Sequence, residues 1–98
     1  MVELVDLPAG RQARRDSMIY TVYVLSSTTK NYLYVGLTHD LDHRIFRHNA
    51  GREKTTRSYR PFRLIHKETF RDRPSARIRE KYLKSGTGKE FLKGSLKQ

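Results

Sequence analysis

Two short apolar runs rich in Tyr and Val lie close together in the first half of the chain. They span 19–25 and 32–37, and the polar segment 26–31 separates them. Apolar, β-branched and aromatic runs of this length are typical of a β-hairpin, here with a loop longer than two residues. The first run is almost continuously apolar, which favours a strand covered on both faces. The second contains Gly36, where the missing Cβ lets backbone or ligand approach closely.

The residues after the second run have the spacing of an amphipathic helix over about 40–50. Asp40 or Thr38 is expected to cap the N-terminus of this helix, and Gly51 is expected to end it. Leu41, Ile45 and His48 fall at positions i, i+4 and i+7 of this helix. Its apolar stripe, Leu41 and Ile45, is expected to face the hairpin, with Arg44 and His48 bordering that stripe.

The next segment is predicted to hold a loop and a third strand. The loop over 51–60 is polar and basic, and the strand begins at about Pro61 and ends at about Phe70. Alternation along this strand is expected to place three side chains on one face, those of Phe62, Leu64 and His66.

Two helices are predicted in the last quarter of the chain. Asp72-Arg73-Pro74 marks the start of the first, because the N–H that proline lacks would have no partner in a first helical turn. This helix is expected over about 74–84. The segment 85–89 contains two glycines and is predicted to be a turn, followed by a short last helix over 90–96.

The length of 98 residues supports one domain with one modest core. We expect that domain over 18–98 and a flexible tail over 1–17, because the tail has no sustained hydrophobic period and contains adjacent Pro and Gly. Met18 directly precedes the first apolar run, so natural translation that starts at Met18 is an alternative to a native tail.

Cysteine is absent, which excludes disulfides and thiolate metal sites. No apolar run approaches the roughly 20 residues of a membrane-spanning helix, and the N-terminus lacks the apolar segment of a signal peptide. We therefore expect a soluble, cytoplasmic protein with no membrane partner.

Basic residues outnumber acidic ones by 21 to 10, which gives a formal net charge of +11. Such a surplus on a small chain indicates an anionic partner, most often nucleic acid. Arginine dominates between 43 and 73, and its planar guanidinium suits bidentate contact with phosphate. The alternative is a solvated face that only keeps the protein soluble.

Four side chains near the predicted strands and first helix are candidates for chemistry. Tyr23 and Tyr34 occupy the two strands of the hairpin, although a strand tyrosine can simply pack. Arg44 and His48 lie four residues apart and therefore on neighbouring positions of the helix. Arg44 could reach a phosphate over the sheet or only cover apolar surface. His48 could contact substrate or be a buried histidine with satisfied hydrogen bonds.

A carboxylate is predicted beside the packing face of the helix over 74–84. Glu80 lies between Ala76 and Leu83 at i+4 and i+7 spacing, an unusual place for a carboxylate unless a cation meets it. The alternative is an exposed Glu80 paired with Lys84. A zinc site is not expected, because the spacing of the histidines at 39, 43 and 48 fits no closed tetrahedral set. A nucleotide-binding Walker loop is not expected either, because that motif needs glycine where Leu83 stands.

Together these residues resemble the signature of the GIY-YIG endonuclease superfamily, from Met18 to Leu96. Thr21-Val22-Tyr23 stands for the first motif and Tyr34-Val35-Gly36 for the second. Three further positions match the Arg, His and Glu of the family, namely Arg44, His48 and Glu80. The departures, Thr-Val for Gly-Ile and Val for Ile, keep both tyrosines. The resemblance, strongest to small stand-alone bacterial members, implies an α+β fold with a small three-stranded antiparallel sheet flanked by helices.

The resemblance also implies a metal-dependent DNA endonuclease acting in DNA repair, recombination or foreign-DNA handling. Tyr34 would then be the general base toward water, Tyr23 would position water or phosphate, and Arg44 would clamp the scissile phosphate. Glu80 would be the single acidic ligand of Mg²⁺ or Mn²⁺. His48 would assist proton transfer or hold a phosphate.

Sequence-independent contacts to DNA, weakened by salt, are expected from the basic region, and Tyr59 there could stack on a base. The predicted nucleic-acid contacts are Arg47, Arg52, Lys54, Arg57, Tyr59, Arg60 and Arg63. The main alternative is a non-catalytic, basic nucleic-acid-binding module that retains the fold, and a second is an unrelated RNA-associated protein. We expect a monomer or weak homodimer, with a partner protein for targeting as a further possibility.

Overall fold

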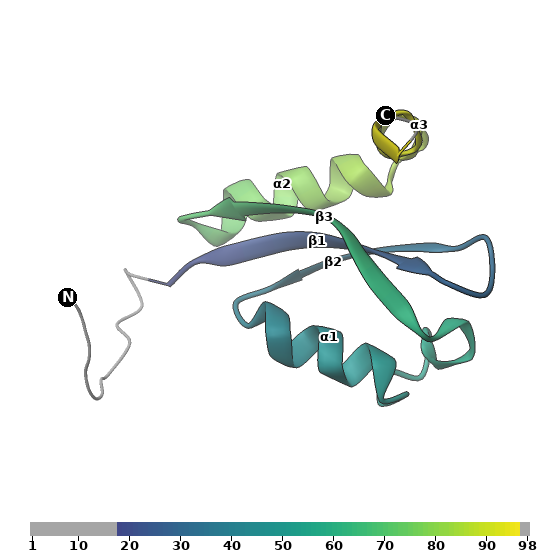
Figure 1. Ribbon diagram of the computed structural model, residues 1–98. Helices are drawn as coiled ribbons and strands as arrows, with labels where there is room; N and C mark the ends of the chain where they lie inside the picture. Colours follow the sequence, from purple (N-terminus) through teal and green to yellow (C-terminus); the bar gives the residue numbers. More distant parts are fainter. Residues whose placement is uncertain (1–17, 97–98) are drawn as a thin grey trace, which may run out of the picture.

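The computed structural model describes residues 18–96, so the predicted tail over 1–17 lies outside the described residues. Three antiparallel strands form one sheet in the order β2-β1-β3. Helix α1 covers one face of the sheet, and α2 and α3 cover the other (Figure 1). This is the predicted α+β fold. The elements are β1 (Tyr20–Ser27), β2 (Leu33–Thr38), α1 (Leu41–Asn49), the 3-10 helix η2 (Arg57–Tyr59), β3 (Phe62–Phe70), α2 (Arg73–Lys84) and α3 (Gly86–Leu96).

The central strand β1 contributes side chains to two hydrophobic cores. Val22 and Val24 point toward α2, whereas Tyr23 and Leu25 point toward α1, and all four are 0% exposed. Successive side chains of a strand point to opposite faces, so the continuously apolar run is needed because both faces are covered. The α2-side core is completed by Val35, Ala76, Leu83 and Leu92.

Helix α1 begins and packs as its sequence predicts. An Asp40 carboxylate oxygen accepts a hydrogen bond from the backbone N–H of His43 at 3.2 Å, which satisfies one of the free donors at the helix start. Leu41 and Ile45 pack against the α1-side core of Tyr23, Leu25 and Phe62. The backbone beyond α1 turns at Gly51, whose φ of +77° favours glycine.

The prediction that His66 shares a face with Phe62 and Leu64 is wrong. Leu64 pairs with Leu25 on the α1 side, whereas His66 pairs with Val24 on the α2 side, because a β-bulge shifts the register between these pairs. An extra residue on one strand moves all later side chains to the other face. The ring of His66 instead lies edge-on to Phe91 of α3, with 6.0 Å between the ring centroids.

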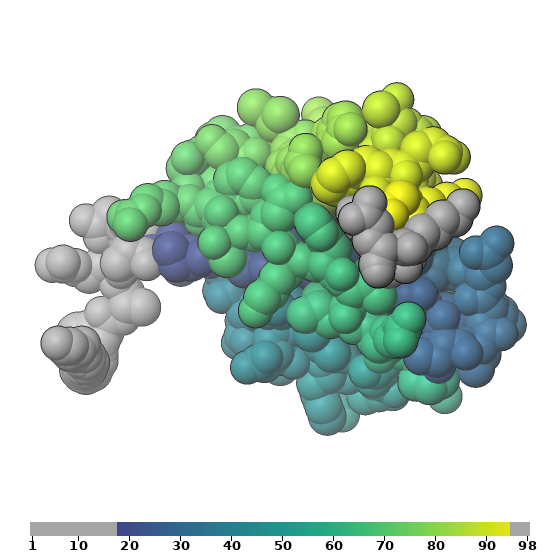
Figure 2. Space-filling view, turned by 45° about the horizontal axis from the view of Figure 1, so that its top comes forward, coloured from purple at the N-terminus to yellow at the C-terminus, as the bar shows by residue number. Residues whose placement is uncertain are grey.

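The predicted glycine turn over 85–89 is also wrong, because α3 already begins at Gly86. The Ser85 hydroxyl accepts a hydrogen bond from the backbone N–H of Gly88 at 3.1 Å, as an N-cap residue does. Gly88 is buried where α3 meets the end of α2. Figure 2 shows the two helices side by side on this face of the molecule. The glycine therefore permits close helix contact and does not form a turn.

Substituting alanine for Gly88 is expected to lower the free energy of unfolding by about 2 kcal/mol or more, because overpacking forces backbone shifts. A Cβ at this position would lie 2.6 Å from Cα of Leu83 and closer still to the carbonyl oxygen of Tyr82, which are rigid backbone atoms. Urea unfolding followed by circular dichroism measures the change. Gly94→Ala is the matched control in the same helix, since nothing lies within 4 Å of its Cβ; a similar loss in both variants would contradict the prediction.

Candidate active site

The two motif tyrosines lie on the face of the sheet that α1 covers. Tyr23 of β1 pairs directly with Gly36 of β2, and the Tyr23 ring lies over this glycine. A Cβ at Gly36 would lie 2.8 Å from Cε1 of Tyr23, with Cζ and the hydroxyl oxygen closer still. The glycine of the second motif therefore provides the space that the tyrosine of the first motif fills.

A chain of hydrogen bonds connects Tyr23 to the loop after α1. The Tyr23 hydroxyl lies 3.2 Å from Nε2 of His48, and Nδ1 of His48 lies 2.9 Å from Oγ1 of Thr56. Thr56 donates its hydroxyl proton to the carbonyl oxygen of Glu53 at 3.5 Å. A carbonyl can only accept, so we infer that Thr56 accepts from His48 Nδ1–H and that Nε2 accepts from the Tyr23 hydroxyl.

The Tyr23 and His48 rings, which these hydrogen bonds join, are both neutral at pH 7. Burial, followed by the charges of Arg44 and Arg47, lowers the pKa of His48 against the opposing effect of Glu53. Burial, followed by the nearby Tyr34 phenol, raises the pKa of Tyr23, although the charge of Arg44 works the other way. His48 is 1% exposed and Tyr23 is 0% exposed, so neither presents its ring to solvent.

Tyr34 and Arg44 form the accessible part of the site. Tyr34 is half-buried, and its ring centroid lies 4.7 Å from that of His48 and 6.1 Å from that of Tyr23. Arg44 is also half-buried, and within residues 18–96 no carboxylate is paired with its guanidinium. The structure thus brings together four of the five predicted catalytic residues and leaves a cation and a phenol available to a ligand.

The burial of neutral His48 predicts a pH-dependent stability. Its pKa is lowered on folding from an ordinary value of about 6.5, so the unfolded chain binds more protons and the free energy of unfolding falls as the pH drops below about 6.5. His48→Gln should remove this slope between about pH 7 and 5.5, whereas the matched change at exposed His43 should keep it. Urea unfolding at several pH values measures both, and a slope that persists in His48→Gln would contradict this assignment.

Glu80 is not part of this cluster, because it lies on α2 at the opposite face of the sheet. It is 5% exposed, and each carboxylate oxygen accepts from one cation of its own helix: Arg77 Nη1 at 2.7 Å and Lys84 Nζ at 2.9 Å. Burial raises the pKa of Glu80, but the hydrogen bonds from Lys84 and Arg77 outweigh it and hold the pKa below its usual range. The predicted pairing with Lys84 is therefore present, with Glu80 buried and not exposed.

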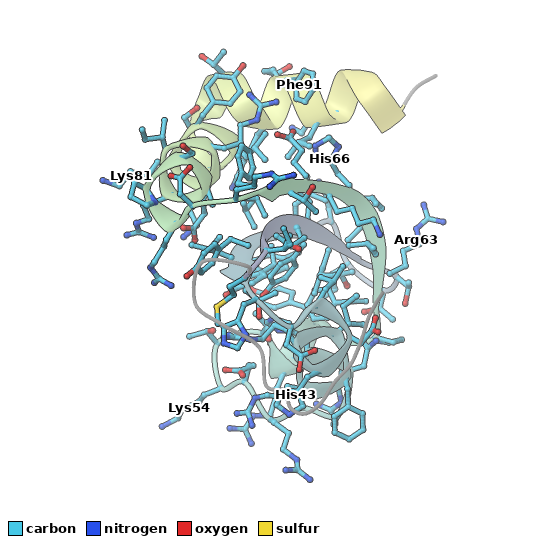
Figure 3. All side chains as sticks on the ribbon, turned by 90° about the vertical axis from the view of Figure 1, so that its left-hand side faces the viewer. His43, Lys54, Arg63, His66, Lys81 and Phe91 are labelled. Carbon is cyan, nitrogen blue, oxygen red and sulfur yellow. The ribbon has the colours of Figure 1, made fainter. Side chains whose placement is uncertain are left out.

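The predicted nucleic-acid contacts are distributed over more than one side of the molecule. Arg47 is paired with Glu53 at 2.6 Å, and Tyr59 is stacked on Tyr32 with 3.8 Å between ring centroids and 9° between ring planes. Lys54 lies on the same side as Lys81 of α2, opposite Arg63 of β3 (Figure 3). The remaining predicted contacts, all exposed, are Arg52, Arg57 and Arg60.

Two residues of the site were not predicted from the sequence. Thr56, which is 0% exposed, lies in a polar stretch with no periodicity that would mark it as buried. Arg77 is one of many basic residues, and its contact with Glu80 follows only from their i, i+3 spacing. Within the described part of the chain, no group of three or more His, Asp or Glu could hold a metal ion, and no helix is long and apolar enough to cross a membrane.

Comparison with known proteins places these observations in a family. The profile of the GIY-YIG catalytic domain matches residues 19–93. A UPF0213 protein of Haloquadratum walsbyi is 40% identical over 67 residues, which cover 67% of this chain and 74% of that protein. A UPF0213 protein of Natronomonas pharaonis is 40% identical over 65 residues, covering 65% of this chain and 75% of that protein.

A solved structure is also similar, the solution NMR structure of a UPF0213 protein from Bacillus halodurans. It shares 35% sequence identity and a TM-score of 0.49, over 79% of this chain and 84% of that chain. The family match spans both tyrosine motifs, the helix with Arg44 and His48, and the helix with Glu80. The chain therefore belongs to the GIY-YIG catalytic domain family, a family of nuclease domains, and is similar to its UPF0213 proteins.

Proposed function

We propose that this protein is a metal-dependent DNA endonuclease that hydrolyses phosphodiester bonds. The observation that carries the proposal is the hydrogen-bonded chain from Tyr23 through His48 to Thr56, placed beside the accessible Tyr34 and Arg44. No carboxylate of residues 18–96 pairs with Arg44, so its guanidinium and the half-buried Tyr34 phenol can both meet a ligand beside His48. Family membership adds the reaction class, since GIY-YIG domains are nuclease domains.

Each residue of the site has a distinct role in this proposal. Arg44 binds the scissile phosphate and neutralises charge on its oxygens. Tyr34, as the phenolate, accepts a proton from water while the water oxygen bonds to phosphorus and the bond to the leaving oxygen breaks. Buried Tyr23 stays protonated and positions His48 beside Tyr34, and Thr56 fixes the tautomer of His48.

Mg²⁺ or Mn²⁺ is the proposed cofactor, in line with the general use of divalent metals by GIY-YIG nucleases. Glu80 would hold it, because an ionised carboxylate is the oxygen donor that such cations prefer, with waters and phosphate completing the coordination. A bound divalent ion supplies Lewis acidity toward the phosphoryl oxygens. The side of the molecule that bears Lys54 and Lys81 is the proposed path of the DNA backbone between the tyrosines and Glu80.

The proposal is tested by cleavage of supercoiled plasmid and of labelled flap, fork and single-stranded DNA with Mg²⁺ or Mn²⁺. Wild type should cleave at least one substrate, and Glu80→Gln should lose cleavage while still binding DNA in a salt-sensitive manner. Lys81→Met, a change on the same helix, should weaken binding without abolishing cleavage. Equal behaviour of wild type and Glu80→Gln would overturn the proposal.

A second candidate is a non-catalytic nucleic-acid-binding module that keeps the same fold. It is favoured by one observation: Glu80 is ion-paired with both Arg77 and Lys84 and lies across the sheet from the tyrosines. Salt-sensitive DNA binding with no cleavage of any substrate by wild type would support this module. DNA repair, recombination or foreign-DNA handling, and targeting by a partner protein, are the proposed settings of the enzyme.

A further inference from the structure

Each carboxylate oxygen of Glu80 already accepts a hydrogen bond from a cationic side chain. Oε1 accepts from Arg77 at 2.7 Å and Oε2 accepts from Lys84 at 2.9 Å. The Glu80 side chain is only 7% exposed, so its carboxylate has little contact with solvent. One negative charge thus faces two positive charges, and a divalent cation that approached Glu80 would meet a net repulsive field.

The cations can leave this arrangement more easily than the carboxylate can. The side chains of Arg77 and Lys84 are 54% and 51% exposed, so each already extends along the surface of α2. Their long flexible stems can turn outward without unpacking the core, whereas Glu80 lies in the packed row of Ala76 and Leu83. The mobile partners of this cluster are therefore the two cations.

We propose that Arg77 and Lys84 keep Glu80 closed to metal until a DNA backbone takes these cations onto its phosphates. This inference rests on the proposed function and adds that metal and DNA bind with positive coupling. Arginine and lysine can leave a carboxylate and bind a phosphate with little loss of interaction free energy, because both anions accept the same charge-assisted hydrogen bonds. When a DNA phosphate binds Arg77 and Lys84, the Glu80 carboxylate beside it becomes free to bind metal. Without DNA, Glu80 stays paired and metal binding is disfavoured.

Coupling of this kind is reciprocal. If DNA raises the affinity of the protein for Mn²⁺, then Mn²⁺ raises the affinity for DNA by the same factor. Removal of either cation should mimic the effect of DNA on Glu80 and reduce the coupling. Each single substitution leaves Glu80 with one cationic partner, so the fold keeps a compensated buried carboxylate.

The test is Mn²⁺ binding, measured from the electron paramagnetic resonance signal of free Mn²⁺ and needing no turnover. Without DNA, Arg77→Met and Lys84→Met should each bind Mn²⁺ about tenfold more tightly than wild type. A phosphorothioate duplex should raise the affinity of wild type by a similar factor and that of Lys84→Met by less. Glu80→Gln measures Mn²⁺ held by the DNA alone. Arg73→Met is the matched control, because it removes an exposed cation of helix α2 that does not pair with Glu80.

Two results would overturn the inference. The first is that Arg77→Met and Lys84→Met bind Mn²⁺ no more tightly than Arg73→Met. The second is that Glu80→Gln binds as much Mn²⁺ as wild type under every condition. Failure of the proposed function gives a different pattern: the two variants bind Mn²⁺ more tightly, yet no protein cleaves any DNA. That pattern would support the control of Glu80 by Arg77 and Lys84 and would contradict the proposed nuclease activity.

Discussion

Replacing Gly36 with alanine is expected to lower the free energy of unfolding by about 3 kcal/mol, at the upper end of the usual cost of overpacking. The added methyl group would overlap the ring of Tyr23, which is 0% exposed and pinned between β2 and α1. The ring cannot tilt away without breaking the hydrogen bond between its hydroxyl and His48. The substitution should therefore destabilise the fold and also disrupt the hydrogen bonds from Tyr23 through His48 to Thr56.

Thermal and urea unfolding measure the loss, and a two-dimensional NMR spectrum of the histidine ring reports the state of His48. Gly86→Ala is the control, because nothing lies within 4 Å of a Cβ at this position in α3. The control should unfold like wild type. Equal stability of the two variants would mean that the Tyr23 ring does not need the space above Gly36.

Removing the hydroxyl of Tyr34 is expected to lower the rate of DNA cleavage by at least about 100-fold, the usual contribution of a positioned general base. Tyr34→Phe keeps the ring that packs beside His48, so the free energy of unfolding should stay the same. The DNA dissociation constant should also be nearly unchanged, because Arg44 and the basic side chains remain. Single-turnover cleavage measures the rate, and fluorescence anisotropy measures binding.

Tyr23→Phe is the matched comparison on the neighbouring strand. It removes a buried hydrogen bond to His48, so the free energy of unfolding should fall by about 1 kcal/mol. Because Tyr23 acts through His48, the pH profile of cleavage should shift, whereas Tyr34→Phe should lower the rate at every pH. Cleavage by Tyr34→Phe at the rate of wild type would show that Tyr34 is not the general base.

Much of the fold follows from local sequence rules. The hairpin strands, the cap at Asp40 and the proline start of α2 each depend on a few neighbouring residues, and the structure has all three. The α3 start was missed because Gly88 suggests a turn, and its contact with the end of α2 becomes visible only in three dimensions. The bulge in β3 has no sequence marker, since no Gly or Pro stands at Ile65.

The candidate site could be predicted only in part, for the same physical reason. Hairpin pairing places Tyr23 over Gly36, and helical spacing places Arg44 and His48 on one side of α1, so these residues converge through short-range geometry. Glu80 lies beyond a third strand and on the other face of the sheet. Its position relative to the tyrosines depends on how α2 crosses the sheet, which periodicity does not specify.

Strand β1 is shared by both hydrophobic cores, and this has a mechanical consequence. Only one layer of backbone separates the side chains under α1 from those under α2, and Val22 and Tyr23 are adjacent on it. A displacement of the strand toward one face is a displacement away from the other. The two faces therefore form a single cooperative unit. A packing defect between α3 and the sheet will also make the position of Tyr23 over Gly36 less well defined, although α3 and Tyr23 lie on opposite faces of the sheet.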